Sequence, residues 1–351
     1  MKKFTIGALL LIGIMCYAQN TYVPDDNFEQ ALIDLGYDNP PLDDYVPTTN
    51  VNTIISLSMP GSGISDLTGI EDFTALVQLN VNANDLSSID ITNLTSLSQL
   101  AAGDNNLTNI DLTQNINLLV LLVYGNQLTN LNISQNLQLI QINVDGNNIS
   151  SLDVSQHLGL ENLSCRFNQL SALNVSNNSM LEGLFCSGNQ ISSIDVSASP
   201  NFRQLIAFNN TLTHLDIKNG NNTNVLFFDT RENPELTCII VDDAIWSEAN
   251  WLDIDPNSTF VNNQSECKLL NAPAFEELLF IAYPNPAKNT ITIEGLEAGN
   301  YNLINHSGQQ LQAGTLTSGT NTLHVAHLPG GIYFLEVTNN KGKGIQKIVK
   351  Q

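Results

Sequence analysis

The sequence predicts an α/β-type solenoid of short parallel strands with few regular helices, followed by a small C-terminal antiparallel β-sandwich. Three observations support this fold class. Asparagine and several apolar residues recur every 21 residues, an amphipathic segment precedes the repeats, and the composition changes after Cys267. Repetition at such a period is typical of stacked units, which must pack on one another because one unit cannot bury its own apolar face.

The repeat register is unbroken from Leu76 to Phe202, where a large apolar residue recurs every 21 positions. An asparagine follows eight residues after each: Asn84, Asn105, Asn126, Asn147, Asn168, Asn189 and Asn210. The next interval is 23 residues, to Val225, and Asn233 again lies eight further on. The pattern L-x-x-L-x-[VAC]-x-x-N-x-[LI] is that of leucine-rich repeats. We expect each asparagine inside the turn after a strand, where its amide both donates to and accepts from interior backbone groups.

Both ends of the repeats, residues 54–236, need caps, because a bare end would expose the core. Residues 19–53 form the expected N-terminal cap, with a helix over 24–36 in which Asp26 and Glu29 suggest a capping box. Phe28, Leu32 and Leu35 would share its buried face. Residues 237–270 form the C-terminal cap, and Cys238 and Cys267 are expected to pair in an oxidising compartment. Cys165 and Cys186 occupy one repeat position and are interpreted as buried core residues.

Two segments carry a resemblance to a known family: residues 22–32 (YVPDDNFEQAL) and 64–71 (ISDLTGIE). They resemble surface leucine-rich-repeat proteins of the Bacteroidetes and, more distantly, the internalin type, over about residues 22–267. The resemblance implies the fold. It implies no ligand, because such proteins share a scaffold and not a target.

The C-terminal segment, residues 271–351, begins with a linker at 271–273 and continues with alternating apolar and polar runs bounded by Gly, Pro and Asn. This pattern favours a small antiparallel β-sandwich. The pieces YPNP, LPGGIYFLEV and the basic end resemble the C-terminal sorting domain of the type IX secretion system. That resemblance implies contact with the secretion machinery and export across the outer membrane of a Gram-negative bacterium, with the protein secreted or attached to the cell surface. An ordinary β-sandwich adhesion domain is the alternative.

The N-terminal residues 1–18 have the features of a secretory signal peptide. Lys2 and Lys3 precede an apolar run over 6–15, which is too short to span a bilayer, and cleavage is expected after Ala18. Cys16 raises lipidation as a lesser alternative, because Met15 stands where a small residue is expected. No other stretch predicts a transmembrane span in the mature chain.

The charge is unevenly distributed. Residues 19–267 carry 29 acidic and four basic side chains, whereas residues 268–351 carry five acidic and six basic ones. The long acidic segment should repel nucleic acid and anionic membranes, and in the simplest reading its charge keeps the protein soluble. The five histidines have no metal-binding or catalytic spacing, and no phosphate loop or nucleophile motif is present. We therefore expect no catalytic residues, no metal site and no cofactor.

One column of acids requires a choice between two interpretations. Its members recur once per coil: Asp90, Asp111, Asn132, Asp153, Asn174, Asp195 and Asp216. A file of carboxylates could bind Ca²⁺. It could also be a row of turn residues that accept hydrogen bonds from their own backbone, and the two asparagines favour this second interpretation.

The strand residues between the apolar columns should point to the concave surface of the sheet. From the third coil onward these positions gain aromatic and branched side chains, a composition that marks interaction sites. The predicted ligand site comprises Tyr124, Arg166, Phe167, Phe185, Phe208 and Arg231. The function expected is recognition of a protein or peptide, or adhesion. A carbohydrate-binding surface protein and a structural surface component are the alternatives, and a glycan ligand stays open at this point.

Overall fold

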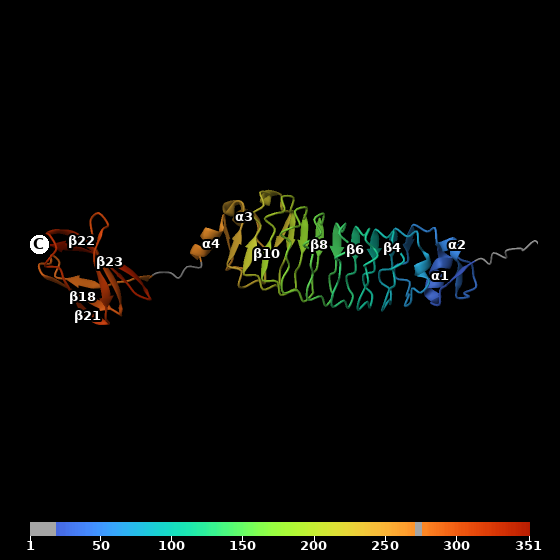
Figure 1. Cartoon of the computed structure of the whole chain (residues 1–351), viewed down its shortest axis with the longest axis horizontal. Coiled ribbons are helices and arrows are strands. Elements are labelled where there is room, and N and C mark those ends of the chain that lie inside the picture. Colours follow the sequence, from blue (N-terminus) through green and yellow to red (C-terminus); the bar gives the residue numbers. More distant parts are fainter. Residues whose placement is uncertain (1–18, 271–275) are drawn as a thin grey trace, which may run out of the picture. The chain divides into compact units, whose positions relative to one another are not determined.

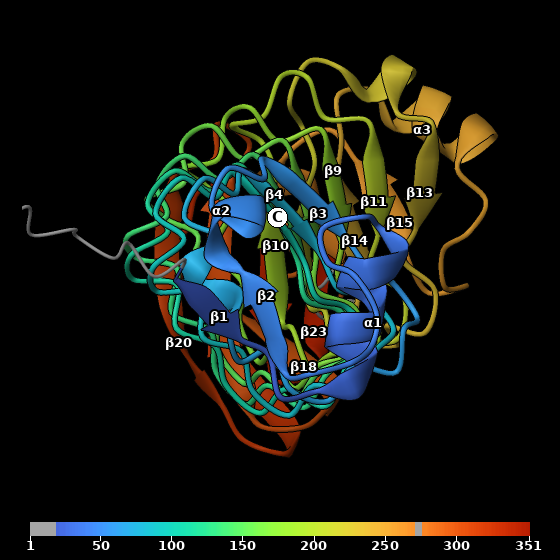
Figure 2. The same ribbon diagram turned by 90° about the vertical axis from the view of Figure 1, so that its right-hand side faces the viewer.

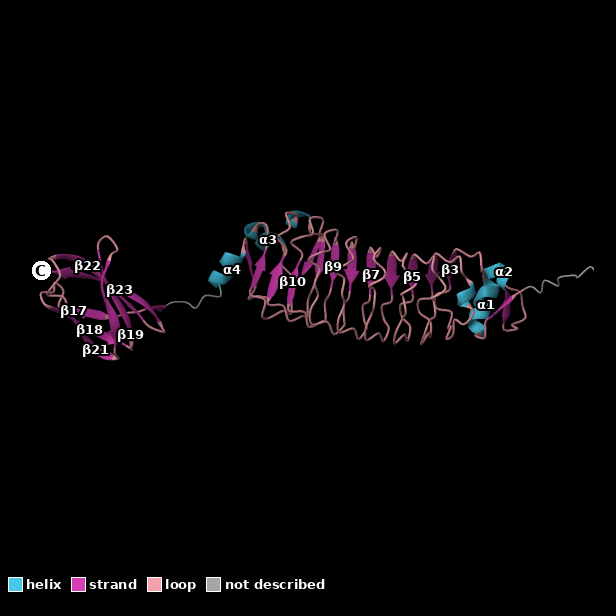
Figure 3. Ribbon diagram, viewed as in Figure 1, coloured by secondary structure: helices cyan, strands magenta, loops and turns pink. Residues whose placement is uncertain are grey.

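The computed structural model describes residues 19–270 and 276–351. The expected signal peptide and the expected linker at 271–273 lie outside these residues. The chain divides into two units between Leu270 and Asn271. Strands far outnumber helices in both units (Figure 3).

The first unit is a solenoid whose coils each contribute one strand to a nine-stranded parallel sheet (Figure 1). In spatial order the strands are β3 (Ser56–Ser58), β4 (Gln78–Asn80), β5 (Gln99–Ala101), β6 (Val120–Leu122), β7 (Gln141–Asn143), β8 (Asn162–Ser164), β9 (Gly183–Phe185), β11 (Gln204–Ile206) and β13 (Phe227–Asp229). We number the coils so that coil one contains β4 and coil eight contains β13. The strands pair in the 21-residue register, with Leu79 opposite Leu100 and Leu100 opposite Leu121. The predicted solenoid fold is confirmed.

A second parallel sheet, of four strands, was not predicted. Its order is β10 (Ser193–Asp195), β12 (His214–Asp216), β14 (Cys238–Ile240) and β15 (Thr259–Val261). β14 and β15 belong to the segment that we had interpreted as cap alone, so the coiled architecture extends beyond Asn233. The sequence does not reveal these strands because each is three residues long, and earlier coils carry the same apolar column without strand pairing.

The N-terminal cap consists of β1 (Asn20–Tyr22), α1 (Asp26–Asp34), β2 (Tyr45–Pro47) and α2 (Thr48–Val51), which lie in front of the coils in the end view (Figure 2). The 3-10 helix η1 (Ile70–Asp72) follows β3. The predicted capping box is wrong. Asp25 caps α1 by accepting from the Asn27 and Phe28 N–H groups at 3.0 and 2.9 Å. Glu29 is buried and accepts from the N–H groups of Asp43 and Asp44.

The buried face of α1 is also narrower than predicted. Phe28 and Leu32 are fully buried, whereas Leu35 is 46% exposed. Leu35 lies at the C-terminal end of the helix, beyond the part that packs on the first coils.

The 3-10 helix η2 (Asn222–Asn224) precedes β13, and the C-terminal cap contains α3 (Ala244–Asn250) and α4 (Gln264–Leu270). A disulfide joins Cys238 in β14 to Cys267 in α4. The Trp251 ring stacks on Phe228 at a centroid distance of 4.3 Å and meets Phe260 edge-on at 5.8 Å. These rings cover the apolar end of the coils.

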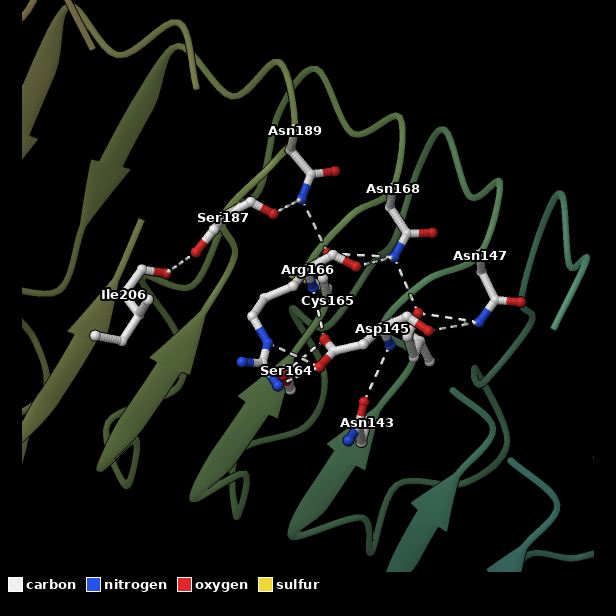
Figure 4. Close-up of polar contacts among 11 residues, drawn as sticks. Asn143, Asp145, Asn147, Ser164, Cys165, Arg166, Asn168, Ser187, Asn189 and Ile206 are labelled. Carbon is white, nitrogen blue, oxygen red and sulfur yellow. Dashed lines mark hydrogen bonds and ion pairs between the residues drawn. The ribbon is translucent and has the colours of Figure 1, made fainter. Parts of the chain in front are cut away.

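The repeated asparagines form a ladder along the solenoid, as predicted. Asn147 is typical: its Oδ1 accepts from the Leu128 N–H at 3.0 Å, and its Nδ2 donates to the carbonyls of Val123 and Val144, both at 3.0 Å. Figure 4 shows this ladder through Asn147, Asn168 and Asn189. Each amide therefore bonds its own turn and ties it to the preceding coil. Cys165 and Cys186 are fully buried beside the ladder, and burial raises the pKa of the Cys186 thiol to about 12.

A second buried polar file, which was not predicted, runs along another side of the solenoid. Its members, again 21 residues apart, are Asn115, Asn136, His157, Asn178 and Ser199. Asn136 Nδ2 donates to the carbonyls of Leu112 and Asn115 at 3.0 and 2.9 Å. His157 bonds one carbonyl, that of Ile133, at 3.2 Å. Since a carbonyl only accepts, Nε2 carries the proton. His157 therefore donates one hydrogen bond at a position where the asparagines of this file donate two.

We predict that His157→Asn stabilises the solenoid. The amide would donate to the carbonyls of both Ile133 and Asn136, as its neighbours in the file do, and would add roughly 1 kcal/mol to the free energy of unfolding. Urea denaturation followed by circular dichroism measures the change. His157→Ala is the control and should lower the midpoint. An asparagine variant that unfolds at or below the wild-type midpoint would refute the ladder interpretation.

The second unit is a β-sandwich of two sheets. The five-stranded sheet has the order β16 (Glu276–Glu277), β23 (Gly342–Lys350), β22 (Gly331–Thr338), β19 (Gly299–Asn305) and β20 (Gln310–Leu316). The three-stranded sheet has the order β17 (Ile281–Tyr283), β18 (Thr290–Leu296) and β21 (Gly319–His324). All pairs are antiparallel except β16 with β23. Ile291, Leu335 and Val337 are fully buried in its core. The predicted small β-sandwich is confirmed.

Candidate binding face

The outward surface of the nine-stranded sheet is the candidate site, and we call it the sheet face. It comprises the first and third residue of each strand, the residue two positions after the strand and, in coil five, also Phe167, three positions after β8. In coils one and two these side chains are small or polar, as in Gln78, Asn80 and Ala101. In coils six to eight they are larger, as in Phe185, Phe208 and Phe227.

The sheet face has a hollow of 340 Å³ over β3 to β6, which the sequence did not indicate. Its lining includes Ser56, Ser58, Gln78, Gln99 and Leu122, and it contains no charged residue. The hollow arises because serine, alanine and amide side chains leave space above strands whose neighbours carry bulkier groups. The predicted site begins at coil three and does not include this hollow.

Arg166, at the middle of the sheet face, is held by Asp145 of the preceding coil (Figure 4). Asp145 Oδ2 accepts from Arg166 Nε at 2.8 Å and lies 2.7 Å from Nη2. Asp145 Oδ1 accepts from the Arg166 N–H and the Ser164 hydroxyl, both at 2.6 Å. The guanidinium carbon lies 5.8 Å from the centre of the Phe185 ring, within cation–π range. Arg166 is therefore a neutralised, preorganised group and not a free positive charge.

Arg231, at the end of the sheet face, is also paired. Its Nη2 lies 2.6 Å from Asp229 and its Nη1 lies 3.4 Å from Asp253. The hydrogen bond with Asp229 raises the pKa of the Arg231 guanidinium. Arg231 and Phe208 line a pocket of 440 Å³ together with Ile254 and Asp255. Both predicted arginines thus contribute shape and hydrogen-bond donors within ion pairs.

The two remaining aromatic side chains each lie against a glycine of a neighbouring coil. A Cβ atom on Gly103 would lie 2.6 Å from the Tyr124 ring, and one on Gly188 would lie 2.6 Å from the Phe167 ring. Phe167 is 56% exposed and has a φ of +52°. Positive φ recurs in this column in all eight coils: Gly125, Gly146 and Gly188 occupy it in three coils, and Ala83, Asp104, Asn209 and Glu232 adopt φ values of +52 to +59° in four others. A bulky side chain with positive φ and little burial is unfavourable for stability.

The structure distributes the six predicted residues over the sheet face and does not gather them into one cleft. Arg166 and Phe185 line one hollow of 250 Å³, Phe208 and Arg231 line another, and Tyr124 and Phe167 lie flat on their glycine neighbours. Tyr124, Phe185 and Phe208 are half-buried. The arrangement is an extended contact surface, which suits a macromolecular ligand better than a small molecule.

The acidic column that suggested calcium consists of turn residues. The Oδ1 atoms of Asp90, Asp111 and Asp153 accept from the N–H groups two residues ahead, at 3.0, 2.9 and 2.9 Å. Asn132 and Asn174 make the same bond. The Thr92 hydroxyl lowers the pKa of Asp90, and the Thr113 N–H lowers that of Asp111. Over the described parts of the chain, no three His, Cys, Asp or Glu side chains are arranged to hold a metal ion.

We predict that calcium leaves the melting temperature unchanged. The carboxylates already accept backbone hydrogen bonds, and Asn132 and Asn174 interrupt the column. Calcium at about 10 mM exceeds the dissociation constants typical of extracellular calcium modules. Differential scanning calorimetry with calcium and with a chelator tests this. A midpoint that rises with calcium in the wild type but not in Asp111→Asn would restore the metal interpretation.

Comparisons with known proteins address both units. Residues 281–351 match the family described as "Secretion system C-terminal sorting domain". No curated protein matches the chain. In the described ranges, 19–270 and 276–351, no helix has the length and hydrophobicity to cross a bilayer.

Three solved structures from Listeria monocytogenes are similar to the chain, each at 20% identity. The match to an internalin (inlF) has a TM-score of 0.50 and covers 71% of this chain and 80% of the internalin chain. The functional domain of InlJ and internalin C2 (inlC2) each have a TM-score of 0.48. The match to InlJ covers 95% of this chain, and the match to inlC2 covers 70% of it. Each covers 99% of the Listeria chain. The likeness to inlF concerns the fold alone. The protein is secreted or surface-attached: its repeat solenoid has a fold similar to that of an internalin, and its C-terminal unit matches a secretion-system sorting domain over residues 281–351.

Proposed function

We propose that this protein recognises a protein partner at the bacterial cell surface, through the sheet face of coils three to eight, and that it acts by binding and not by catalysis. The main support for this proposal is that Phe167 is an exposed aromatic residue in a backbone conformation that lowers stability. Residues kept in unfavourable conformations are concentrated at functional sites. Export by the sorting domain is consistent with this role.

The chemistry of the sheet face supports a protein partner over a glycan. The rings of Tyr124 and Phe167 lie against glycines of neighbouring coils, and the two arginines are already paired with carboxylates. Broad surfaces with aromatic and arginine side chains are typical of protein interfaces.

The test is capture of surface proteins by the chain from Gln19 onward, followed by affinity measurement for each captured protein, beside a glycan array. Phe208→Ala should weaken the specific partner by at least about tenfold, because aromatic residues dominate interface energies. Ile245→Ala, which alters a side chain 85% exposed on α3, is the matched control and should leave affinity unchanged. Equal affinity of both variants for every captured protein, or binding to glycans alone, would overturn the proposal.

A further inference from the structure

A straight file of exposed aliphatic side chains lies on the flank of coils three to five, away from the sheet face. Ile116, Leu137 and Leu158 are 52, 53 and 62% exposed and are spaced 21 residues apart. We call them the flank file. Each directly follows a member of the second buried polar file, whose Asn136 donates across to the Asn115 carbonyl. The turns are thus held in register, and the side chains recur at the coil spacing of roughly 4.8 Å.

Two of the three side chains of the flank file, Ile116 and Leu137, lie in a belt that carries no charge. Residues 112–144 include no acidic or basic side chain, although residues 19–267 carry 29 acidic and four basic ones. Leu158 lies outside this belt, between Asp153 and Glu161. Elsewhere on this unit, two copies of the chain would repel each other. On the belt, the apolar side chains can approach a second copy with the least electrostatic repulsion. An exposed apolar patch of this kind marks an interaction surface.

We propose that the flank file pairs two copies of this chain in an antiparallel arrangement about a two-fold axis at Leu137. Three evenly spaced side chains are self-complementary about their centre, which is what a two-fold interface requires. Leu137 then meets Leu137 of the second copy, and Ile116 meets Leu158 of the second copy.

The residues on either side of the flank file favour an antiparallel pair over a parallel one. On one side lie the half-buried apolar Leu119 and Ile140 and the exposed Glu161, and on the other lie Asp111, Asn132 and Asp153. An antiparallel two-fold places Ile140 opposite its counterpart and Leu119 opposite Glu161 of the second copy. A parallel pair would set the apolar side of each copy against the polar side of the other.

The pair is weak and depends on concentration. Three partly exposed side chains present far less than the roughly 800 Å² per partner of a stable interface. Asp111 of one copy faces Asp153 of the other at the rim, so salt strengthens the pair by screening. A surface-attached protein reaches the high local concentration at which such contacts form.

Cysteine cross-linking of the chain from Gln19 onward tests the arrangement. Leu137→Cys should form a disulfide-linked dimer under mild oxidation at least about tenfold faster than Thr129→Cys, an exposed control outside the file. A mixture of Ile116→Cys and Leu158→Cys should cross-link, whereas Ile116→Cys alone should not. The native Cys165 and Cys186 are fully buried, and Cys238 is bonded to Cys267, so the background is low.

Two results would overturn the proposal: Leu137→Cys linking no faster than Thr129→Cys, or Ile116→Cys alone linking as fast as Leu137→Cys. Sedimentation velocity gives an independent reading. The wild type should shift toward dimer as concentration and salt rise, and Leu137→Asp should remain monomeric with an unchanged circular dichroism spectrum. A Leu137→Asp variant that associates like the wild type would also exclude the flank file.

Discussion

Replacing Asn147 with alanine should destabilise the solenoid by about 3–4 kcal/mol. The variant removes the acceptor of the Leu128 N–H and the donor to the Val123 and Val144 carbonyls, all at 3.0 Å. Asn147 is 6% exposed, so water reaches these groups poorly. Buried backbone groups left without partners cost about 1–3 kcal/mol each.

Two further asparagines of the same region serve as internal standards. Asn148→Ala alters an exposed neighbour and should change stability by less than about 0.5 kcal/mol. Asn136→Ala, in the second file, removes two donated bonds but no accepted one, so its loss should be intermediate, about 2 kcal/mol. Urea unfolding of all three variants ranks their losses of stability. If Asn147→Ala and Asn148→Ala unfold at the same urea concentration, the ladder does not stabilise the coils.

Local unfolding gives a second reading of the same prediction. Each coil contacts mainly its two neighbours, so stability in a solenoid is a sum of coil and interface contributions. Loss of Asn147 should therefore raise amide hydrogen exchange most in coils three and four, whose turns its side chain connects. A uniform rise along the whole solenoid would show instead that the coils unfold as one cooperative unit.

The fold could be predicted from the sequence because the 21-residue repeat register determines which residues stack on one another. A residue repeated every 21 positions must stack on itself, so the inward columns and the asparagine ladder follow directly. The same logic could have found two features that were missed. Asp145 and Arg166 are 21 residues apart, which places them side by side on the sheet face. Asn115 and Asn136 likewise share a column, but His157 and Ser199 interrupt its composition and hide its common role.

Other features of the site depend on side-chain conformations, which cannot be read from the repeat register. The hollow over β3 to β6 is lined by the exposed Gln78 and Gln99, and whether they fill it depends on their rotamers. The left-handed backbone at Phe167 could have been inferred from Gly125, Gly146 and Gly188 in the same column. What the sequence could not show is that its ring lies across Gly188 and stays exposed.

Replacing Phe167 with asparagine should change folding and binding in opposite directions. Asparagine adopts positive φ more readily than phenylalanine, and coil seven already places Asn209 in this column at a φ of +54°. Relief of the backbone strain should raise the free energy of unfolding by about 1 kcal/mol. Loss of the exposed ring should weaken a sheet-face partner by about 2 kcal/mol, or about 30-fold.

The reciprocal variant separates strain from any general effect of asparagine. Asn209→Phe places a phenylalanine at the same backbone conformation in coil seven and should lower stability by about 1 kcal/mol. Urea unfolding measures the stability of both variants, and titration of the captured partner measures affinity. If Phe167→Asn is less stable than the wild type, the ring is there for packing, and the main argument for a binding role of the sheet face fails. If it is more stable and binds less tightly, the phenylalanine is retained at the expense of folding, which only a function on that surface explains.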